Sequence, residues 1–244
     1  MKTLLATVVF ASLLVVAPQA DASLFLSDWG VSYGNWAPGA NAPTQTHYLV
    51  EDYISGNNGY LDPGYGGNGF DVEAVYLGWD ADYLYMGVVT GFPSSGRWQN
   101  GEYYVAGDLA LDVTGDGNYD FAVDTSHNGW LRTGSLVWEN PSIEGNEAWG
   151  GVSDPLRVTS WTDSHTLAGY SYGWFSGRYA IEAKVDRSLI GSVSSYDLHW
   201  TMGCGNDAGD LHANVDPIPE PASLLLLGGG LFAAGAARRL RRKI

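Results

Sequence analysis

DVEAVYLGWDADYLYMGVVTG, from Asp71 to Gly91, predicts the fold of this chain most directly. From Val72 to Trp79, side chains alternate between two sets, as they do on the two faces of a β-strand. Asp80-Ala81-Asp82 supplies a turn, and Tyr83 to Thr90 returns as a second strand. Because this second strand is almost wholly apolar or aromatic, we expect it to lie in the centre of a sheet.

The same kind of pattern continues on both sides of this hairpin. Gly, Asn, Asp and Ser separate short runs of Val, Leu, Tyr, Trp and Phe, and no segment keeps a helical period. The sequence therefore predicts an all-β fold, an antiparallel β-sandwich of jelly-roll-like form. Further strands are expected over Tyr103–Val113, Tyr119–Asp124, Gly129–Trp138, His165–Phe175, Arg178–Val185 and Leu198–Gly203.

Two segments of the domain are expected to be irregular. Ser23 to Phe70 is loop-rich and contains Pro38, Pro43 and Pro63, so we expect it to wrap the sandwich. Asp186 to Ile190 is expected to form a single helical turn.

The first 22 residues have the three parts of a secretory signal. Lys2 supplies the positive start, Leu4 to Val16 is an apolar run, and Ala20-Asp21-Ala22 offers small residues for cleavage after Ala22. The alternative is a buried N-terminal helix. We expect a signal peptide over residues 1–22 and an exported domain over 23–216.

The last 28 residues, 217–244, have the features of a membrane anchor. A proline-rich break precedes Ala222–Ala237, an uncharged run rich in Leu, Ala and Gly, and basic residues follow. As a helix these 16 residues would span ~24 Å, short of the ~30 Å hydrocarbon core, and snorkelling arginines or a thinner bilayer could make up the difference. We expect a short hydrophobic helix here, with the basic end inside the cell.

This tail resembles the PEP-CTERM sorting signal. The resemblance rests on a Pro-Glu-Pro triplet, the short apolar span and a terminal basic cluster: Pro219, Glu220, Pro221, Arg238, Arg239, Arg241 and Arg242. It implies processing by an exosortase-type membrane enzyme in a Gram-negative bacterium that makes exopolysaccharide. The chain would be anchored transiently in the inner membrane and then released to the cell surface or the medium. The alternative is a permanent tail anchor.

The charge of the exported domain limits its partners. Residues 23–216 hold 25 of the 27 acidic residues but only 6 of the 12 basic ones, which gives a formal charge of −19. Such a domain repels nucleic acid and anionic membranes and attracts divalent cations. Cys204 is the only cysteine, so no intrachain disulfide forms. We expect Cys204 to be buried, and the alternative is an intermolecular bridge.

Parts of the domain resemble other exported proteins. Asp71–Gly87, Gly107–Asp120 and Tyr179–Gly191 are similar to strands of family 9 carbohydrate-binding modules and of DOMON-like sandwiches. Three phrases are similar to a group of PEP-CTERM proteins that implies no function: Val50-Glu51-Asp52, Tyr60 to Gly67, and Cys204-Gly205-Asn206-Asp207.

The stretch from Asp112 to Asp120 is the sharpest local motif. Oxygen-bearing side chains occupy every second position, with Gly117 at the sixth, as in calcium loops: Asp112, Thr114, Asp116, Asn118 and Asp120. It departs from the EF-hand because Val123 stands where a bidentate Glu would be. The alternative is a β-turn in which Asp and Asn bond their own backbone. Calcium is thus a predicted ligand of this loop.

Four tryptophans lie beside turn-forming residues and are candidates for stacking on sugars: Trp98, Trp130, Trp149 and Trp161. The alternative for each is packing against the N-terminal wrap. The five histidines lack metal-ligand spacing, and no nucleophile elbow is present. We therefore expect a non-catalytic surface or extracellular-matrix protein that binds extracellular polysaccharide. The alternative is a secreted glycan-active enzyme, because a carboxylate pair could be hidden among the many acids.

Overall fold

The structure is a computed structural model, and it describes residues 23–51, 67–99, 101–127, 129–139 and 156–215. The chain divides into two compact units, and the boundary falls after Ala213. The predicted signal peptide, the sorting tail with its hydrophobic helix, and Trp149 lie outside the described residues. Among the helices of the described ranges, none has the length and apolar character needed to cross a membrane.

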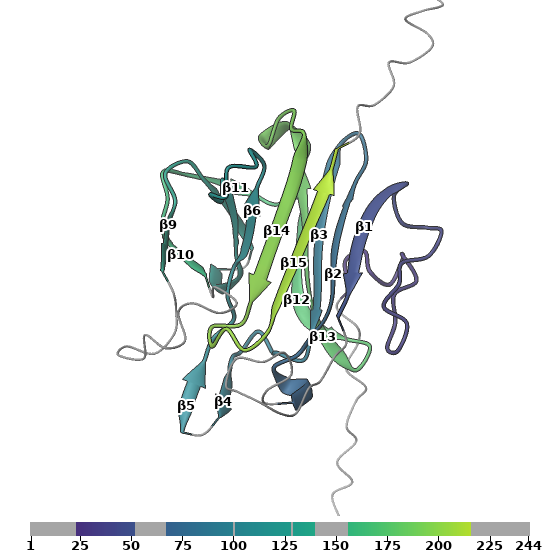
Figure 1. The fold of residues 1–244 in the computed structure, drawn as a ribbon, viewed down its shortest axis with the longest axis vertical. Helices are drawn as coiled ribbons and strands as arrows, with labels where there is room; N and C mark the ends of the chain where they lie inside the picture. The colour runs from purple at the N-terminus through teal and green to yellow at the C-terminus, as the bar shows by residue number, and fades with distance from the viewer. Residues whose placement is uncertain (1–22, 52–66, 100, 128, 140–155, 216–244) are drawn as a thin grey trace, which may run out of the picture. The chain divides into compact units, whose positions relative to one another are not determined.

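The first unit is all-β, with antiparallel sheets, as the sequence predicts (Figure 1). One sheet has five strands in the order β1 (Gln45–Val50), β2 (Val72–Trp79), β3 (Tyr83–Thr90), β13 (Arg178–Asp186) and β12 (Gly169–Phe175). Strand β3 lies at its centre, and β2 pairs with it through the predicted turn. Asp80 closes this turn because its Oδ1 accepts the N–H groups of Asp82 and Tyr83, at 2.8 and 2.7 Å.

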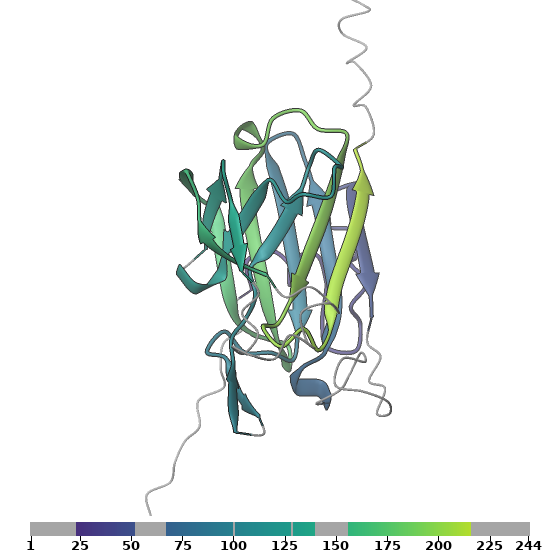
Figure 2. The ribbon, with the colours of Figure 1, turned by 60° about the vertical axis from the view of Figure 1, so that its left-hand side comes forward.

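The second sheet has six strands. Their order is β11 (Asp163–Thr166), β8 (Trp130–Thr133), β7 (Phe121–Asp124), β6 (Leu109–Asp112), β14 (Ser195–Thr201) and β15 (Ala208–Asn214). The two sheets form the layers of a sandwich, which Figure 2 shows from a second direction.

Smaller elements extend from this sandwich. Two hairpins form sheets of their own, β4 (Arg97–Gln99) with β5 (Glu102–Tyr104), and β9 (Val137–Glu139) with β10 (Arg157–Ser160). The β4–β5 hairpin projects from one end of the molecule (Figures 1 and 2). Within the described residues there are also three 3-10 turns: η1 (Gly67–Gly69), η2 (Thr125–His127) and η4 (Arg187–Leu189). The last of these is the helical turn that the sequence predicts.

The main core lies between the two sheets. Trp79 of β2 contacts Tyr196 of β14, with ring centroids 5.3 Å apart. Leu198 and Trp200 follow Tyr196 at alternate positions and are also buried. The sheets approach each other closely at Gly209 of β15, where a Cβ would lie 2.1 Å from Val75 Cγ2, so this position requires glycine.

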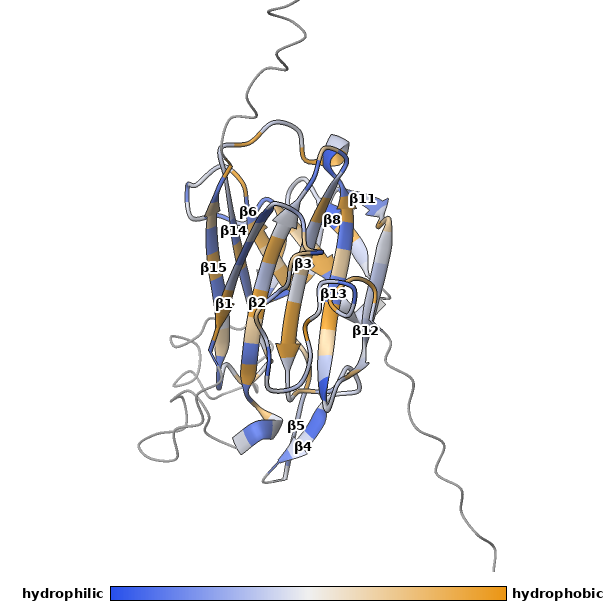
Figure 3. Cartoon of the chain, turned by 90° about the vertical axis from the view of Figure 1, so that its right-hand side faces the viewer, coloured by the Kyte–Doolittle hydropathy of each residue, from blue (hydrophilic) through white to orange (hydrophobic). Residues whose placement is uncertain are grey.

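A second core lies on the other side of the five-stranded sheet. The N-terminal segment, residues 23–42, packs its apolar side chains onto β2, β3, β12 and β13. Its buried members are Phe25, Leu26, Trp29, Val31 and Trp36. This cover explains why all eight residues of β2 are buried, although one side of the strand faces away from the other sheet. Figure 3 shows the apolar residues along β2 and β3 from this side.

The strand predictions differ from the structure in their boundaries. The predicted strand Tyr103–Val113 is divided into β5 and β6, Gly129–Trp138 into β8 and β9, and His165–Phe175 into β11 and β12. A glycine with positive φ causes the second break, because Gly134 has φ 84° and turns the chain. The sequence analysis also missed four strands, namely β1, β4, β10 and β15.

Candidate functional site

The outer face of the six-stranded sheet is polar, although most of it is buried. Its strands are in register, so paired residues share a face, as Ala122 does with Arg132 and Ala110 with His199. The face opposite the main core therefore carries a row of buried polar side chains: Asp112, Asp124, Arg132 and His199. Such a row needs internal partners, because a buried polar group without a hydrogen bond is costly.

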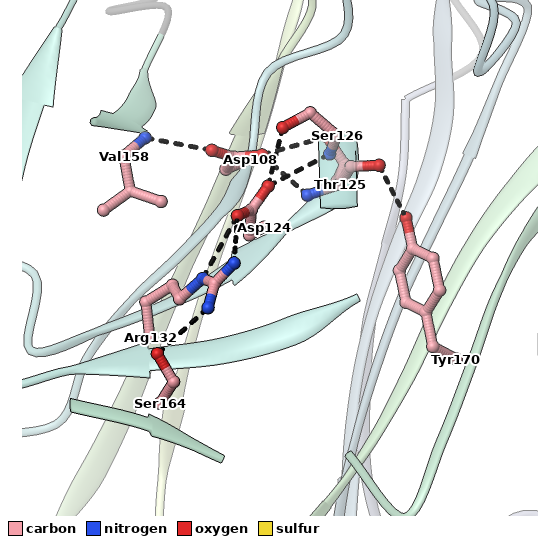
Figure 4. A network of polar contacts seen from close by, with 8 residues as sticks. All are labelled: Asp108, Asp124, Thr125, Ser126, Arg132, Val158, Ser164 and Tyr170. Atoms are coloured by element: carbon pink, nitrogen blue, oxygen red, sulfur yellow. Dashed lines mark hydrogen bonds and ion pairs between the residues drawn. The ribbon is translucent and has the colours of Figure 1, made fainter. Parts of the chain in front are cut away.

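Arg132, on β8, lies at one end of this row and takes part in a network of polar contacts (Figure 4). Its Nε and Nη2 donate to Oδ2 of Asp124, at 3.1 and 2.8 Å, and its Nη1 donates to Ser164 Oγ at 2.9 Å. Oδ1 of Asp124 accepts from the Ser126 hydroxyl at 2.7 Å. The guanidinium group is thus held in one orientation by β7 and β11.

Asp108 lies beside this network and attaches the β9–β10 hairpin to the sheet. Its Oδ1 accepts the N–H and hydroxyl of Thr125, at 2.7 and 2.9 Å, and its Oδ2 accepts the Val158 N–H at 2.9 Å. Burial raises the pKa of Asp108 to about 6, although these hydrogen bonds oppose the rise. With three donors in place, this carboxyl has a structural role.

The structure brings two of the four candidate tryptophans together. The Arg132 Cζ lies 3.9 Å from the ring centroid of Trp161 and 5.6 Å from that of Trp130. Trp130 is 41% exposed and Trp161 is half-buried, so both indoles reach the surface around one guanidinium group. We call Trp130, Arg132 and Trp161 the indole–arginine cluster.

Trp98 lies elsewhere, on the β4–β5 hairpin. It is 69% exposed, and its ring centroid is 5.4 Å from that of Tyr103 on the paired strand. The three candidates that the structure describes therefore do not form one continuous surface.

Two histidine–aspartate pairs cross from β14 to β15. His199 Nδ1 is 2.7 Å from Asp210 Oδ1, and His212 Nδ1 is 2.5 Å from Asp197 Oδ1. Tyr119 stacks on His199, with ring centroids 5.8 Å apart. The sequence indicated only that these histidines lack metal-ligand spacing, and their carboxylate partners become visible only in the fold.

The predicted calcium loop joins β6 to β7. The two carboxylate oxygens of Asp112 accept the N–H groups of Thr114, Gly115 and Gly117, at 2.7 to 2.8 Å. These bonds outweigh the opposing effect of burial and lower the pKa of Asp112. Asp116 is exposed, and its Oδ1 accepts the Asn118 N–H at 2.9 Å. These are the bonds of the self-bonded turn, and calcium at this loop stays a prediction.

A second group of carboxylates was missed by the sequence analysis. Glu51, Asp71 and Asp207 each offer an oxygen, and these oxygens lie within 4.8 Å of one another. Burial raises the pKa of Asp207 to about 6, against hydrogen bonds from Val72 and Ala208. Oxygen ligands in such a group can hold a hard divalent cation. Glu51 and Asp207 belong to two of the phrases noted in the sequence, but their meeting cannot be read from their separation.

A cavity of about 460 Å³ opens between the N-terminal segment and the β2–β3 turn. Its lining mixes aromatic and polar side chains, including Phe25, Trp29, Tyr85, Asp28 and Asp80. Its volume is within the range of small-molecule sites.

Cys204 is buried, as predicted, and burial raises the pKa of its thiol to about 12. The thiolate is therefore scarce at neutral pH, and this thiol is a poor nucleophile.

Comparison with known proteins gives one match, and it concerns the tail. Residues 217–242 match the model of the PEP-CTERM protein-sorting motif. A search of the curated proteins gave no match, and a search of the solved structures gave none. The chain thus carries a PEP-CTERM motif, which marks an exported protein that an exosortase sorts to the cell surface.

Proposed function

We propose that the exported domain is a non-catalytic surface or extracellular-matrix protein that binds exopolysaccharide. The observation that supports this most is the indole–arginine cluster on the outer face of the six-stranded sheet. Indole faces stack on the C–H surfaces of sugars, and partly exposed aromatics grouped with a polar side chain are typical of binding sites.

The bonds around Arg132 prepare this cluster for binding. The Asp124 carboxylate and the Ser164 hydroxyl hold the guanidinium group, and the guanidinium group contacts both indole rings. A rigid site loses little conformational entropy when a ligand binds. Because the domain has a formal charge of −19, we expect a neutral polysaccharide rather than an anionic one.

Affinity electrophoresis through gels that contain the host's exopolysaccharide tests this proposal. Trp130→Ala and Trp161→Ala should each weaken retention, with Kd about tenfold higher. Tyr48→Ala is the matched control, since Tyr48 is 45% exposed but lies on β1 of the other sheet. If only Trp98→Ala lost retention, the binding site would lie on the β4–β5 hairpin instead. Equal retention of all these variants would refute aromatic binding.

The alternative, a secreted glycan-active enzyme, is tested in the same samples. Incubation with the polysaccharide should leave its chain length unchanged. New reducing ends would favour the enzyme.

The sorting pathway and a calcium ligand complete the proposal. A signal peptidase removes residues 1–22, the apolar span of the tail holds the chain in the inner membrane, and an exosortase-type enzyme cuts near Pro219-Glu220-Pro221.

Calcium binds the loop from Asp112 to Asp120 and offsets the mutual repulsion of its carboxylates.

A further inference from the structure

Glu182 receives the start of the predicted mature chain. It lies on β13, is fully buried, and accepts three successive backbone N–H groups. Leu24 N donates to Oε2 at 2.8 Å, while Phe25 N and Leu26 N both donate to Oε1 at 2.7 Å. The Ser23 hydroxyl adds a bond to Oε1 at 3.2 Å. Converging N–H groups of this kind form a nest that favours a negative charge.

The segment packs closely against the neighbouring strands. Gly87 of β3 is the register partner of Glu182, and a Cβ there would be in ordinary contact with both Leu26 and Phe25, at 3.5 Å. A Cβ on Gly169 of β12 would lie 2.8 Å from Leu24 Cδ2. The first residues of the segment are therefore fitted closely to the sheet around Glu182.

The described residues provide no cationic partner for this carboxylate. The two basic side chains of β13 are engaged elsewhere, since Arg178 pairs with Glu73 and the Lys184 Nζ lies 3.8 Å from the Tyr83 ring centroid. No lysine, arginine or histidine within the described ranges forms an ion pair with Glu182. A buried carboxylate without a counter-charge is costly even when it is hydrogen-bonded.

The predicted cleavage site places a positive charge at this position. Hydrolysis of the Ala22–Ser23 peptide bond takes up one water and leaves a carboxylate on Ala22 and an ammonium group on Ser23. Of the four bonds from described residues, Oε2 accepts one, from the residue next to Ser23, so it has capacity for another donor. The Ser23 hydroxyl already contacts the other oxygen of the same carboxylate.

We infer that Glu182 is the binding site for the α-ammonium group of processed Ser23, and that this ion pair locks the N-terminal segment onto the sheet. The inference rests on the proposed cleavage after Ala22. Before cleavage the Ser23 nitrogen is an uncharged amide, so the precursor lacks the pair. The segment carries Phe25, Leu26 and Trp29 of the second core, so the lock stabilises that whole core.

Proteins with defined N-termini test the inference independently of processing in the cell. The mature protein is released from a cleavable fusion so that Ser23 is its first residue. It is compared with the same protein acetylated at Ser23, and with one that retains Ala20 to Ala22. We expect the free form to melt several degrees higher than either, and the amides of Leu24 to Leu26 to exchange hydrogen more slowly.

Glu182→Gln should abolish the effect of acetylation, because the variant has no charge to pair with. Glu73→Gln is the matched control, a buried acid on β2 whose partner is Arg178. It should lower stability but keep the effect of acetylation. Equal melting and equal exchange of the free and acetylated forms would overturn the inference, and this comparison needs no variant to fold. If the exported protein begins at another residue, the cleavage proposal is wrong, but these comparisons still decide the role of Glu182.

Discussion

Several carboxylates of this domain accept backbone N–H groups from a turn or from a neighbouring segment. They are Asp80, Asp108, Asp112, Asp207 and Glu182. Hydrogen bonds to charged groups are stronger than those between neutral groups. The high acid content therefore does more than make the domain soluble. Part of it closes turns and fastens segments that the strands leave irregular.

The raised pKa values of two of these carboxyl groups predict how the free energy of unfolding changes with pH. Burial raises the pKa of Asp108 and of Asp207 to about 6, above the ordinary 3.8. Between pH 4 and 6 the folded state then binds more protons than the unfolded state, so stability should fall as the pH rises through this window. The effect is on the order of 2–3 kcal/mol for each group.

Urea denaturation at several pH values, in buffer without divalent cations, measures this slope. Asp207→Asn should reduce the slope, although the variant is less stable throughout because its NH2 group would face the N–H of either Val72 or Ala208. Asp163→Asn is the control, an exposed side chain on β11, and should leave the slope unchanged. Stability that rises steadily from pH 4 to 6 would contradict the prediction.

Among the elements, the loop between β6 and β7 carries the calcium prediction. An ion that binds only the folded state stabilises it by about 2.7 kcal/mol at a hundredfold excess over Kd. The melting temperature should then rise by roughly 5–10 °C. Asp116→Ala should remove most of the rise in melting temperature, because the fifth position of such loops faces the ion. The substitution leaves the bonds of Asp112 intact, since Asp116 is exposed and takes no part in them. Magnesium should act weakly, since it demands tighter octahedral geometry.

Scanning calorimetry with each cation separates the outcomes. Asp207→Asn is the informative control, because Asp207 belongs to the other carboxylate group. A calcium effect lost only in Asp207→Asn would place the ion there. Equal shifts with both cations that survive Asp116→Ala would indicate charge screening, and the loop would be the self-bonded turn.

The hairpin of β2 and β3 could be predicted because its information is local. Alternation over eight residues and a turn with an Asp cap lie within one stretch of sequence. Strand β1 could not be predicted in this way, because Tyr48, Leu49 and Val50 are exposed and show no alternation. It is a strand because β2 offers it backbone partners.

The candidate site was predictable only in its parts. Trp130 and Trp161 stood out as aromatics beside turn residues, but their meeting depends on the register that pairs β8 with β11. The role of Arg132 was missed, since nothing in the neighbouring sequence indicates that Asp124 would face it. A one-residue shift in the pairing of β8 with its neighbours would turn the Arg132 side chain into the main core. The register of these strands therefore determines whether the site forms.

For the whole molecule, the signal peptide and the sorting motif predict one cut each. Intact-mass analysis of the extracellular protein should show Ser23 as its first residue and the loss of Ala222 to Ile244. Replacing Pro219-Glu220-Pro221 by alanines should leave the full tail on a protein retained in the membrane fraction. Recovery of an intact C-terminus from the medium would contradict the prediction.

The attachment of Leu24 to Glu182 also sets an order of events during export. The two residues are 158 positions apart, so the N-terminal segment leaves the membrane first but its docking strand emerges among the last. Until β12 and β13 have formed, Phe25, Leu26 and Trp29 can cover only β2 and β3, and Glu182 is not yet in place to hold the segment. Contacts between such distant residues slow folding, and apolar side chains that wait in the open invite aggregation. Closure of the second core is therefore a late step in folding, and the one at which a chaperone would protect this chain most.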